Sequence, residues 1–114
     1  MKTFENDILN EGLNIAMEFG ENWLNPIQER LSRKYPKLDE EDLDYLNIYC
    51  REAMFEGHQF IPKILDDADK PILSDQLSEL FSDFIRNKYN WINKENINRL
   101  FSQGCYYAWK DGYL

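Results

Sequence analysis

The chain has 114 residues, of which 43% are hydrophobic and 30% are charged, and its formal net charge at pH 7 is -8. This composition is typical of one folded domain over residues 1-114 and excludes a disordered chain. No apolar run reaches the ~20 residues of a membrane-spanning helix, and the first residues lack the basic start and apolar core of a secretory signal. We therefore expect a cytoplasmic protein.

The negative charge is concentrated in the middle of the chain. Ten acidic and two basic residues lie between residues 39 and 69, whereas the remainder has eleven of each sign. An acidic surface repels phosphate groups and attracts cationic ones. The distribution therefore disfavours nucleic acid and anionic membranes as partners, and it favours a basic protein partner.

Apolar residues recur at helical spacing in five segments of the chain. Helices are expected near residues 4-19, 26-35, 39-57 with a continuation to about 67, 72-89 and 93-111. Pro26, Asp39 and Asn93 are start signals, because proline suits the first helical position and Asp and Asn cap free amides. The predicted fold class is all-α, a compact five-helix bundle.

Residues 50-57 and 105-112 share a pattern of small and bulky residues. In each stretch a Cys and an Ala lie three apart, followed by a bulky side chain and then a Gly at which a helix can end. The match predicts two stacked helical hairpins related by a weak internal repeat. It also predicts a helix end at Gly57, with a kink or a new turn before Pro62.

The sequence offers no catalytic motif, and no metal or cofactor site is predicted. Cys50 and Cys105 lie in apolar helical patterns, where a reduced Cys packs as a small hydrophobe. The single His58 lacks the Glu-x-x-His pairing of di-iron bundles and follows the expected end at Gly57, so we expect a surface or capping residue. The protein is therefore predicted not to be an enzyme.

An enzymatic alternative comes from two short acidic motifs, Glu18-Phe19-Gly20-Glu21 and Glu41-Asp42-Leu43-Asp44. They resemble the Glu-x-x-Glu and Glu-x-x-Asp pairs of the all-α MazG-type nucleotide pyrophosphohydrolases. The resemblance implies that four carboxylates share metal ions bound to the phosphates. These carboxylates would be Glu18, Glu21, Glu41 and Asp44. The sequence departs from the family where Gly20 interrupts the first pair and where the second pair lies in a first helical turn, a position that suits acids for the dipole alone.

The preferred hypothesis is a small acidic protein-binding module, such as an immunity or inhibitor protein that neutralises a basic enzyme. Its binding residues are expected at the start of the third helix, where carboxylates attract the partner and two tyrosines anchor it. These residues are Asp39, Glu40, Glu41, Asp42, Asp44, Tyr45 and Tyr49. The alternative is a solvated helix face with the tyrosines in the core.

A third hypothesis is a structural scaffold that acts as a homodimer. The last predicted helix is apolar nearly all round, and one face cannot bury all of its aromatic side chains. The predicted dimer interface contains Phe101, Tyr106, Trp109 and Tyr113. The alternative is that this helix lies centrally within the fold.

Overall fold

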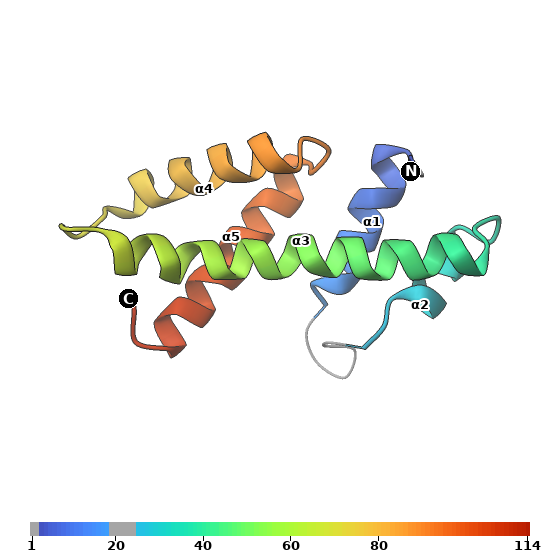
Figure 1. Ribbon diagram of the computed structural model, residues 1–114, viewed down its shortest axis with the longest axis horizontal. Helices are drawn as coiled ribbons and strands as arrows, with labels where there is room; N and C mark the ends of the chain where they lie inside the picture. Colours follow the sequence, from blue (N-terminus) through green and yellow to red (C-terminus); the bar gives the residue numbers. More distant parts are fainter. Residues whose placement is uncertain (1–2, 19–24) are drawn as a thin grey trace. The chain divides into compact units, whose positions relative to one another are not determined.

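The computed structural model describes residues 3–18 and 25–114. Within these ranges the protein is all-α and has no strand, which confirms the predicted fold class. The five helices are α1 (Asn6–Ala16), α2 (Gln28–Lys34), α3 (Glu40–Asp67), α4 (Ser74–Lys88) and α5 (Lys94–Lys110) (Figure 1). The chain divides into two compact units, Met1–Met54 and Phe55–Leu114, and α3 contributes residues to both.

The longest helix, α3, runs without a break from Glu40 to Asp67, and Pro62 lies inside it. The predicted helix end at Gly57 is therefore wrong. Gly57 is buried in the interior of α3, where it serves packing and not helix termination. A glycine at this position of the sequence can indicate either a left-handed helix end or a close contact between helices, and Gly57 makes a close contact.

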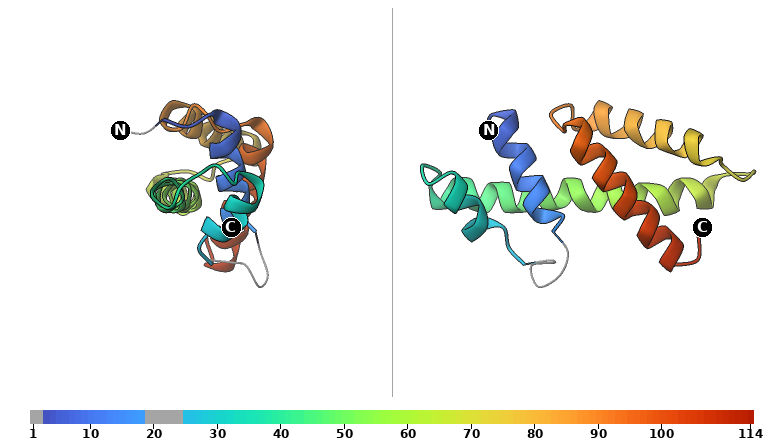
Figure 2. Two further views of the ribbon diagram at one scale, coloured as in Figure 1. Left: turned by 90° about the vertical axis from the view of Figure 1, so that its right-hand side faces the viewer. Right: turned by 180° about the vertical axis from the view of Figure 1, so that it is seen from behind.

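In the second unit, α5 crosses α3 at a pair of glycines (Figure 2). A Cβ atom added to Gly57 would lie 2.5 Å from Leu100 Cδ2, and Leu100 is fully buried. A Cβ atom added to Gly104 would lie 3.0 Å from Ile61 Cγ1 and 3.5 Å from the carbonyl oxygen of Gly57. The absence of side chains at both positions therefore allows the two helices to approach closely.

The predicted internal repeat is not confirmed. Gly112, the counterpart of Gly57, follows the end of α5 with a φ of 88°. The amide of Gly112 donates to the carbonyl of Trp109 at 3.1 Å, and that of Tyr113 donates to the carbonyl of Ala108 at 2.8 Å. These two bonds form a Schellman motif that ends the helix. The two glycines thus have different structural roles.

In the first unit, α1 packs on the first half of α3 at a second small-residue contact. A Cβ atom added to Gly12 would lie 2.7 Å from Cys50 Sγ, and this thiol donates to the carbonyl of Leu9 at 3.6 Å. Burial raises the pKa of the Cys50 thiol to about 12, so the group stays protonated. Cys50 and Cys105 are both free thiols, and of the two only Cys50 is buried.

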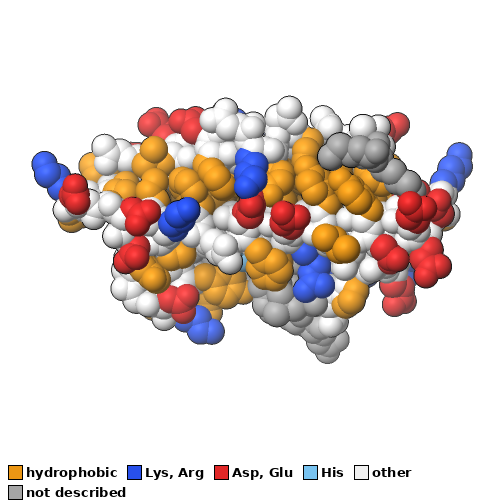
Figure 3. Space-filling view, viewed as in Figure 1, with side chains coloured by type: hydrophobic (Ala, Val, Ile, Leu, Met, Phe, Trp, Pro, Cys, Tyr) orange, Lys and Arg blue, Asp and Glu red, His pale blue; other side chains and the backbone are white. Residues whose placement is uncertain are grey.

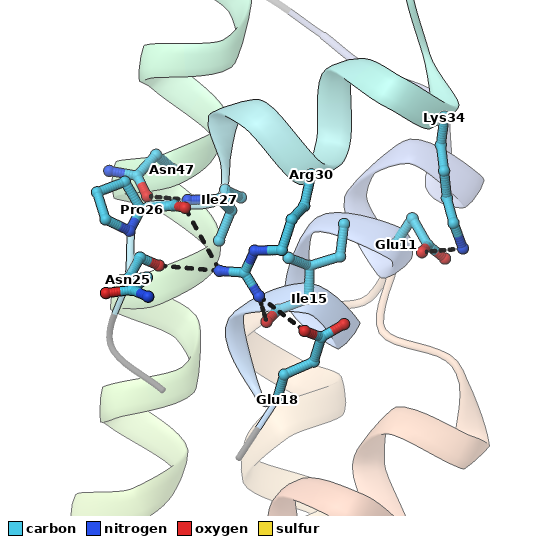
Figure 4. Close-up of polar contacts among 9 residues, drawn as sticks. All are labelled: Glu11, Ile15, Glu18, Asn25, Pro26, Ile27, Arg30, Lys34 and Asn47. Carbon is cyan, nitrogen blue, oxygen red and sulfur yellow. Dashed lines mark hydrogen bonds and ion pairs between the residues drawn. The ribbon is translucent and has the colours of Figure 1, made fainter. Parts of the chain in front are cut away.

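Arg30 of α2 contacts both the end of α1 and the residues that precede α2 (Figure 4). Its Nη1 donates to the carbonyl of Ile15 at 3.2 Å and to Glu18 Oε2 at 2.8 Å. Its Nη2 donates to the carbonyls of Asn25 at 3.0 Å and Pro26 at 3.4 Å. The guanidinium group therefore satisfies a carbonyl in the last turn of α1 and fixes the approach to α2.

Four phenylalanine rings lie together in the second unit, around the buried Phe81. Phe60 stacks on Phe84 with ring centroids 4.6 Å apart, and Phe81 lies 5.8 Å from Phe60 and 5.4 Å from Phe101. Phe81 is fully buried. In the part of the chain that the structure describes, none of the helices combines the length and apolar character that a membrane span needs.

We predict that Gly57→Ala destabilises the protein by about 1–3 kcal/mol, because the new methyl group overpacks the contact with Leu100. The higher helix propensity of alanine, worth about 1 kcal/mol, does not offset this cost. In the Leu100→Ala background the same change becomes neutral or stabilising. Urea unfolding of the wild type, the two single variants and the double variant measures the coupling between Gly57 and Leu100. Equal effects of Gly57→Ala in both backgrounds contradict the close contact.

We predict that Arg30→Lys lowers the free energy of unfolding by about 1–2 kcal/mol, since lysine keeps the charge but cannot reproduce the forked contacts. The matched control is Arg33→Lys, because Arg33 is 70% exposed and its ion pair with Glu29 lies on the surface of α2. The control should change stability by less than about 0.5 kcal/mol. Both values come from urea unfolding, and equal losses would argue against the role of Arg30.

Candidate protein-binding surface

The start of α3 is held by two of the predicted acidic residues. The amide of Asp42 donates to Asp39 Oδ1 at 2.7 Å, and the amide of Asp39 donates to Asp42 Oδ2 at 3.3 Å. This reciprocal pair satisfies amides at the helix N-terminus and places negative charge near the positive end of the dipole. Asp39 and Asp42 therefore have a structural role as a capping box.

The other three predicted acids, Glu40, Glu41 and Asp44, are exposed. Asp44 Oδ1 accepts a hydrogen bond from Gln28 Nε2 at 3.2 Å, which fixes its carboxylate beside α2. Acidic side chains gather where α3 begins (Figure 3). A partner that approaches the start of α3 therefore meets several carboxylates together.

Beside these acids, three aromatic rings form a stacked row. Tyr45 lies between Phe4 and Tyr49, with centroid distances of 5.7 Å and 5.8 Å and interplanar angles of 28° and 22°. Both tyrosines are half-buried, so part of each ring remains accessible to a partner. Mutual stacking restricts the ring orientations, so the row is ordered before any partner binds.

Ile48 is the most exposed large apolar side chain of α3, at 67%. It follows Glu41 and Tyr45 at the helical spacing i, i+4 and i+7, so the three residues share one side of α3. We call the following residues the acidic-aromatic surface: Phe4, Glu40, Glu41, Asp44, Tyr45, Ile48 and Tyr49. Sequence reasoning missed Phe4 and Ile48, although the spacing of Ile48 was a usable signal.

The four carboxylates of the pyrophosphohydrolase hypothesis have the following places. The Glu18 carboxylate is bound by Arg30, Glu41 and Asp44 are exposed on α3, and Glu21 lies outside the described residues. Among the residues that the structure describes, no three His, Cys, Asp or Glu side chains are grouped so as to hold a metal ion. The geometry therefore gives this hypothesis no support.

A groove of about 460 Å³ lies between the second half of α3 and α4. The stacked rings of Phe60 and Phe84 are apolar lining residues, and charged side chains accompany them. The lining residues are Glu56, Gln59, Phe60, Lys63, Ile64, Asp67, Phe84 and Lys88. Sequence reasoning did not identify this groove, because it forms only where two helices meet.

Glu56 is held in place by two side-chain contacts in the groove. Its carboxylate accepts hydrogen bonds from Lys88 Nζ at 2.6 Å and from the buried Tyr89 hydroxyl at 2.5 Å. Burial raises the pKa of the Glu56 carboxyl, but the bonds from Lys88 and Tyr89 outweigh it and leave the pKa below its ordinary value. Glu56 is therefore ionised and already paired at neutral pH, so it joins the two helices.

His58 is buried, and the expectation of a surface or capping residue is wrong. Because α3 continues past Gly57, His58 faces α5 instead of leaving the helix. Its Nε2 lies within hydrogen-bond distance of Gln103 Oε1, at 3.0 Å, and its ring centroid lies 5.1 Å from that of Tyr107. Burial lowers the pKa of His58, and the bond to Gln103 only partly opposes that effect.

The predicted dimer residues have different environments. Trp109, Tyr106 and Tyr113 are 64%, 46% and 44% exposed. Phe101 is half-buried, with its ring 5.4 Å from that of Phe81 in the core of the second unit. Three of the four side chains are thus accessible on the protein surface.

Comparison with known proteins finds no matching family model, no similar curated protein and no similar solved structure. The chemistry of the described surfaces is therefore the basis for assigning a function.

We predict that the free energy of unfolding falls as the pH is lowered from about 6.5 toward 5. The unfolded chain binds a proton at an ordinary histidine pKa of about 6.5, whereas the folded protein binds it only at lower pH, so acid favours unfolding. His58 is the single histidine, so His58→Gln should flatten this dependence. Urea unfolding at pH 5, 6 and 7 gives the slopes. Identical slopes for the two proteins contradict the burial of a neutral imidazole.

Proposed function

We propose that the protein is a small acidic protein-binding module that binds a basic protein through the acidic-aromatic surface. An immunity or inhibitor protein, which neutralises a basic enzyme by covering it, is the class that this chemistry fits best. The observation that carries the proposal is the combination of exposed carboxylates, an ordered aromatic row and the exposed Ile48 on one side of α3.

The charges and the apolar residues of this surface would contribute differently to binding. Glu40, Glu41 and Asp44 would attract a basic partner at long range and orient it, which mainly raises the association rate. Apolar contact would then hold the complex, because burying a large aliphatic side chain is worth about 1.5–3 kcal/mol. Ile48, at 67% exposure, has most of its surface left to bury.

The tyrosine row supports the same proposal. Tyrosine and tryptophan are enriched among the residues that dominate protein-protein binding energies. Tyr45 and Tyr49 are already ordered by stacking, so binding would cost less side-chain entropy than it would for free rings. The chain's net charge of -8 further favours a cationic partner over nucleic acid.

The test is affinity capture from the native cell, followed by quantitative mass spectrometry. The variant is Glu40→Gln/Glu41→Gln/Asp44→Asn, which leaves the capping pair Asp39 and Asp42 intact. We predict that the wild type captures a basic protein, that the variant captures it about tenfold less, and that 0.5 M salt releases it.

The matched control removes three exposed carboxylates from the second unit, through Asp66→Asn/Asp69→Asn/Glu79→Gln. It carries the same net charge as the variant, so only position differs. The control should retain the captured protein. If both triple variants lose the captured protein equally, net charge alone attracts it. If both retain it equally, the acidic-aromatic surface is not the binding site. Either result contradicts the proposal.

The contribution of the exposed Ile48 is tested separately with Ile48→Asp, which adds a carboxylate. If charge alone mediated binding, this change would strengthen the complex. We predict the opposite, a loss of about tenfold or more, because a charged group would be buried in an apolar contact. Ile48 is 67% exposed, so the change should leave the helical circular dichroism signal intact.

A further inference from the structure

We propose that the outer face of α5 is an antiparallel dimer interface with a second copy of this chain. This face consists of Glu95, Arg99, Ser102, Tyr106, Trp109 and Lys110, which recur at helical spacing. Arg99 is half-buried, and the other five residues are exposed. The buried residues of α5 lie elsewhere on its circumference. The proposal is independent of the acidic-aromatic surface on α3.

The apolar part of this face is formed by Trp109 and Tyr106. Trp109 is 64% exposed and Tyr106 is 46% exposed, and their rings lie 6.3 Å apart in an edge-to-face arrangement. Residues of these types at the centre of an interface contribute most of its binding energy. The pair is therefore an ordered apolar anchor that a second molecule can cover.

The charge pattern of the outer face identifies the second molecule. Glu95 lies seven residues before Ser102, and Lys110 lies seven residues after Gln103. In an antiparallel pair with its twofold axis at the centre of α5, Glu95 faces Lys110 of the partner subunit. The face is therefore complementary in charge to itself.

The residues nearer the twofold axis, Arg99 and Tyr106, also attract each other in the antiparallel pair. Arg99 lies three residues before Ser102, and Tyr106 lies three residues after Gln103, so the guanidinium group of one copy faces the phenol ring of the other. A cation over an aromatic face is attractive. The small Ser102 lies at the crossing, where a bulky side chain would hold the helices apart.

Competing arrangements fit less well. A parallel pair places Glu95 against Glu95 and Lys110 against Lys110, which repel. The outer face has one acid and two bases, whereas residues 39 to 69 have ten acids and two bases. The outer face of α5 therefore does not carry the excess of negative charge that residues 39 to 69 carry. Because two 17-residue helices form a small interface, we expect a dissociation constant on the order of 10 μM.

Charge reversal tests both the dimer and its orientation. Glu95→Lys alone and Lys110→Glu alone each place like charges together at both ends of the pair, so each protein should be monomeric at 100 μM. An equimolar mixture of the two variants restores opposite charges at both ends and should form a heterodimer. Sedimentation velocity and light scattering, with the wild type at the same concentration, measure these states.

The matched controls are Glu79→Lys and Lys70→Glu, which make the same charge changes outside α5 and should dimerise as the wild type does. Trp109→Ala should weaken dimerisation about tenfold or more while circular dichroism stays helical, because the side chain is exposed. A wild type that is monomeric at 500 μM overturns the proposal. So do single charge variants that dimerise normally, or a mixture that stays monomeric.

Discussion

Close helix contacts at residues without bulky side chains are the constraint on which both units depend. In the first unit, Gly12 of α1 lies against the thiol of Cys50. In the second unit, Gly57 of α3 and Gly104 of α5 allow the backbones of these two helices to come together. Because protein interiors are packed as densely as organic crystals, an added methyl group has no space at these contacts. The same helix, α3, supplies a small residue to each.

This packing determines which residues remain for binding. In each unit, the side of α3 that packs against its neighbouring helix, α1 in the first unit and α5 in the second, is occupied mainly by apolar and small residues. Most charged residues of α3 and several of its aromatic ones therefore lie on other sides. The capping pair Asp39 and Asp42 then fixes where the helix begins and hence where the exposed carboxylates lie. The helical periodicity of α3 therefore determines both which residues are buried in the core and which remain exposed for binding.

Sequence reasoning identified the five helices that the structure describes because apolar spacing is a local signal, although α2 begins at Gln28 and not at the predicted Pro26. Asp39 and Asn93 accept the capping bonds expected of them. The error at Gly57 has a physical cause, since a glycine in a helix can mark a left-handed end or a close contact with another element. Only the position of Leu100, which is 43 residues away in sequence, decides between these roles. The prediction for His58 failed for the same reason, because this side chain faces α5 only if α3 continues past Gly57.

The sequence by itself determined the all-α class, the approximate helix bounds and the concentration of acidic residues between residues 39 and 69, because these follow from local periodicity and composition. The tertiary structure decided which acids cap α3 and which are exposed, that Phe4 stacks on Tyr45, and that Trp109 and Tyr106 share the outer face of α5 with Glu95 and Lys110. Such arrangements depend on which side each helix buries. That choice is made by contacts between residues far apart in the chain.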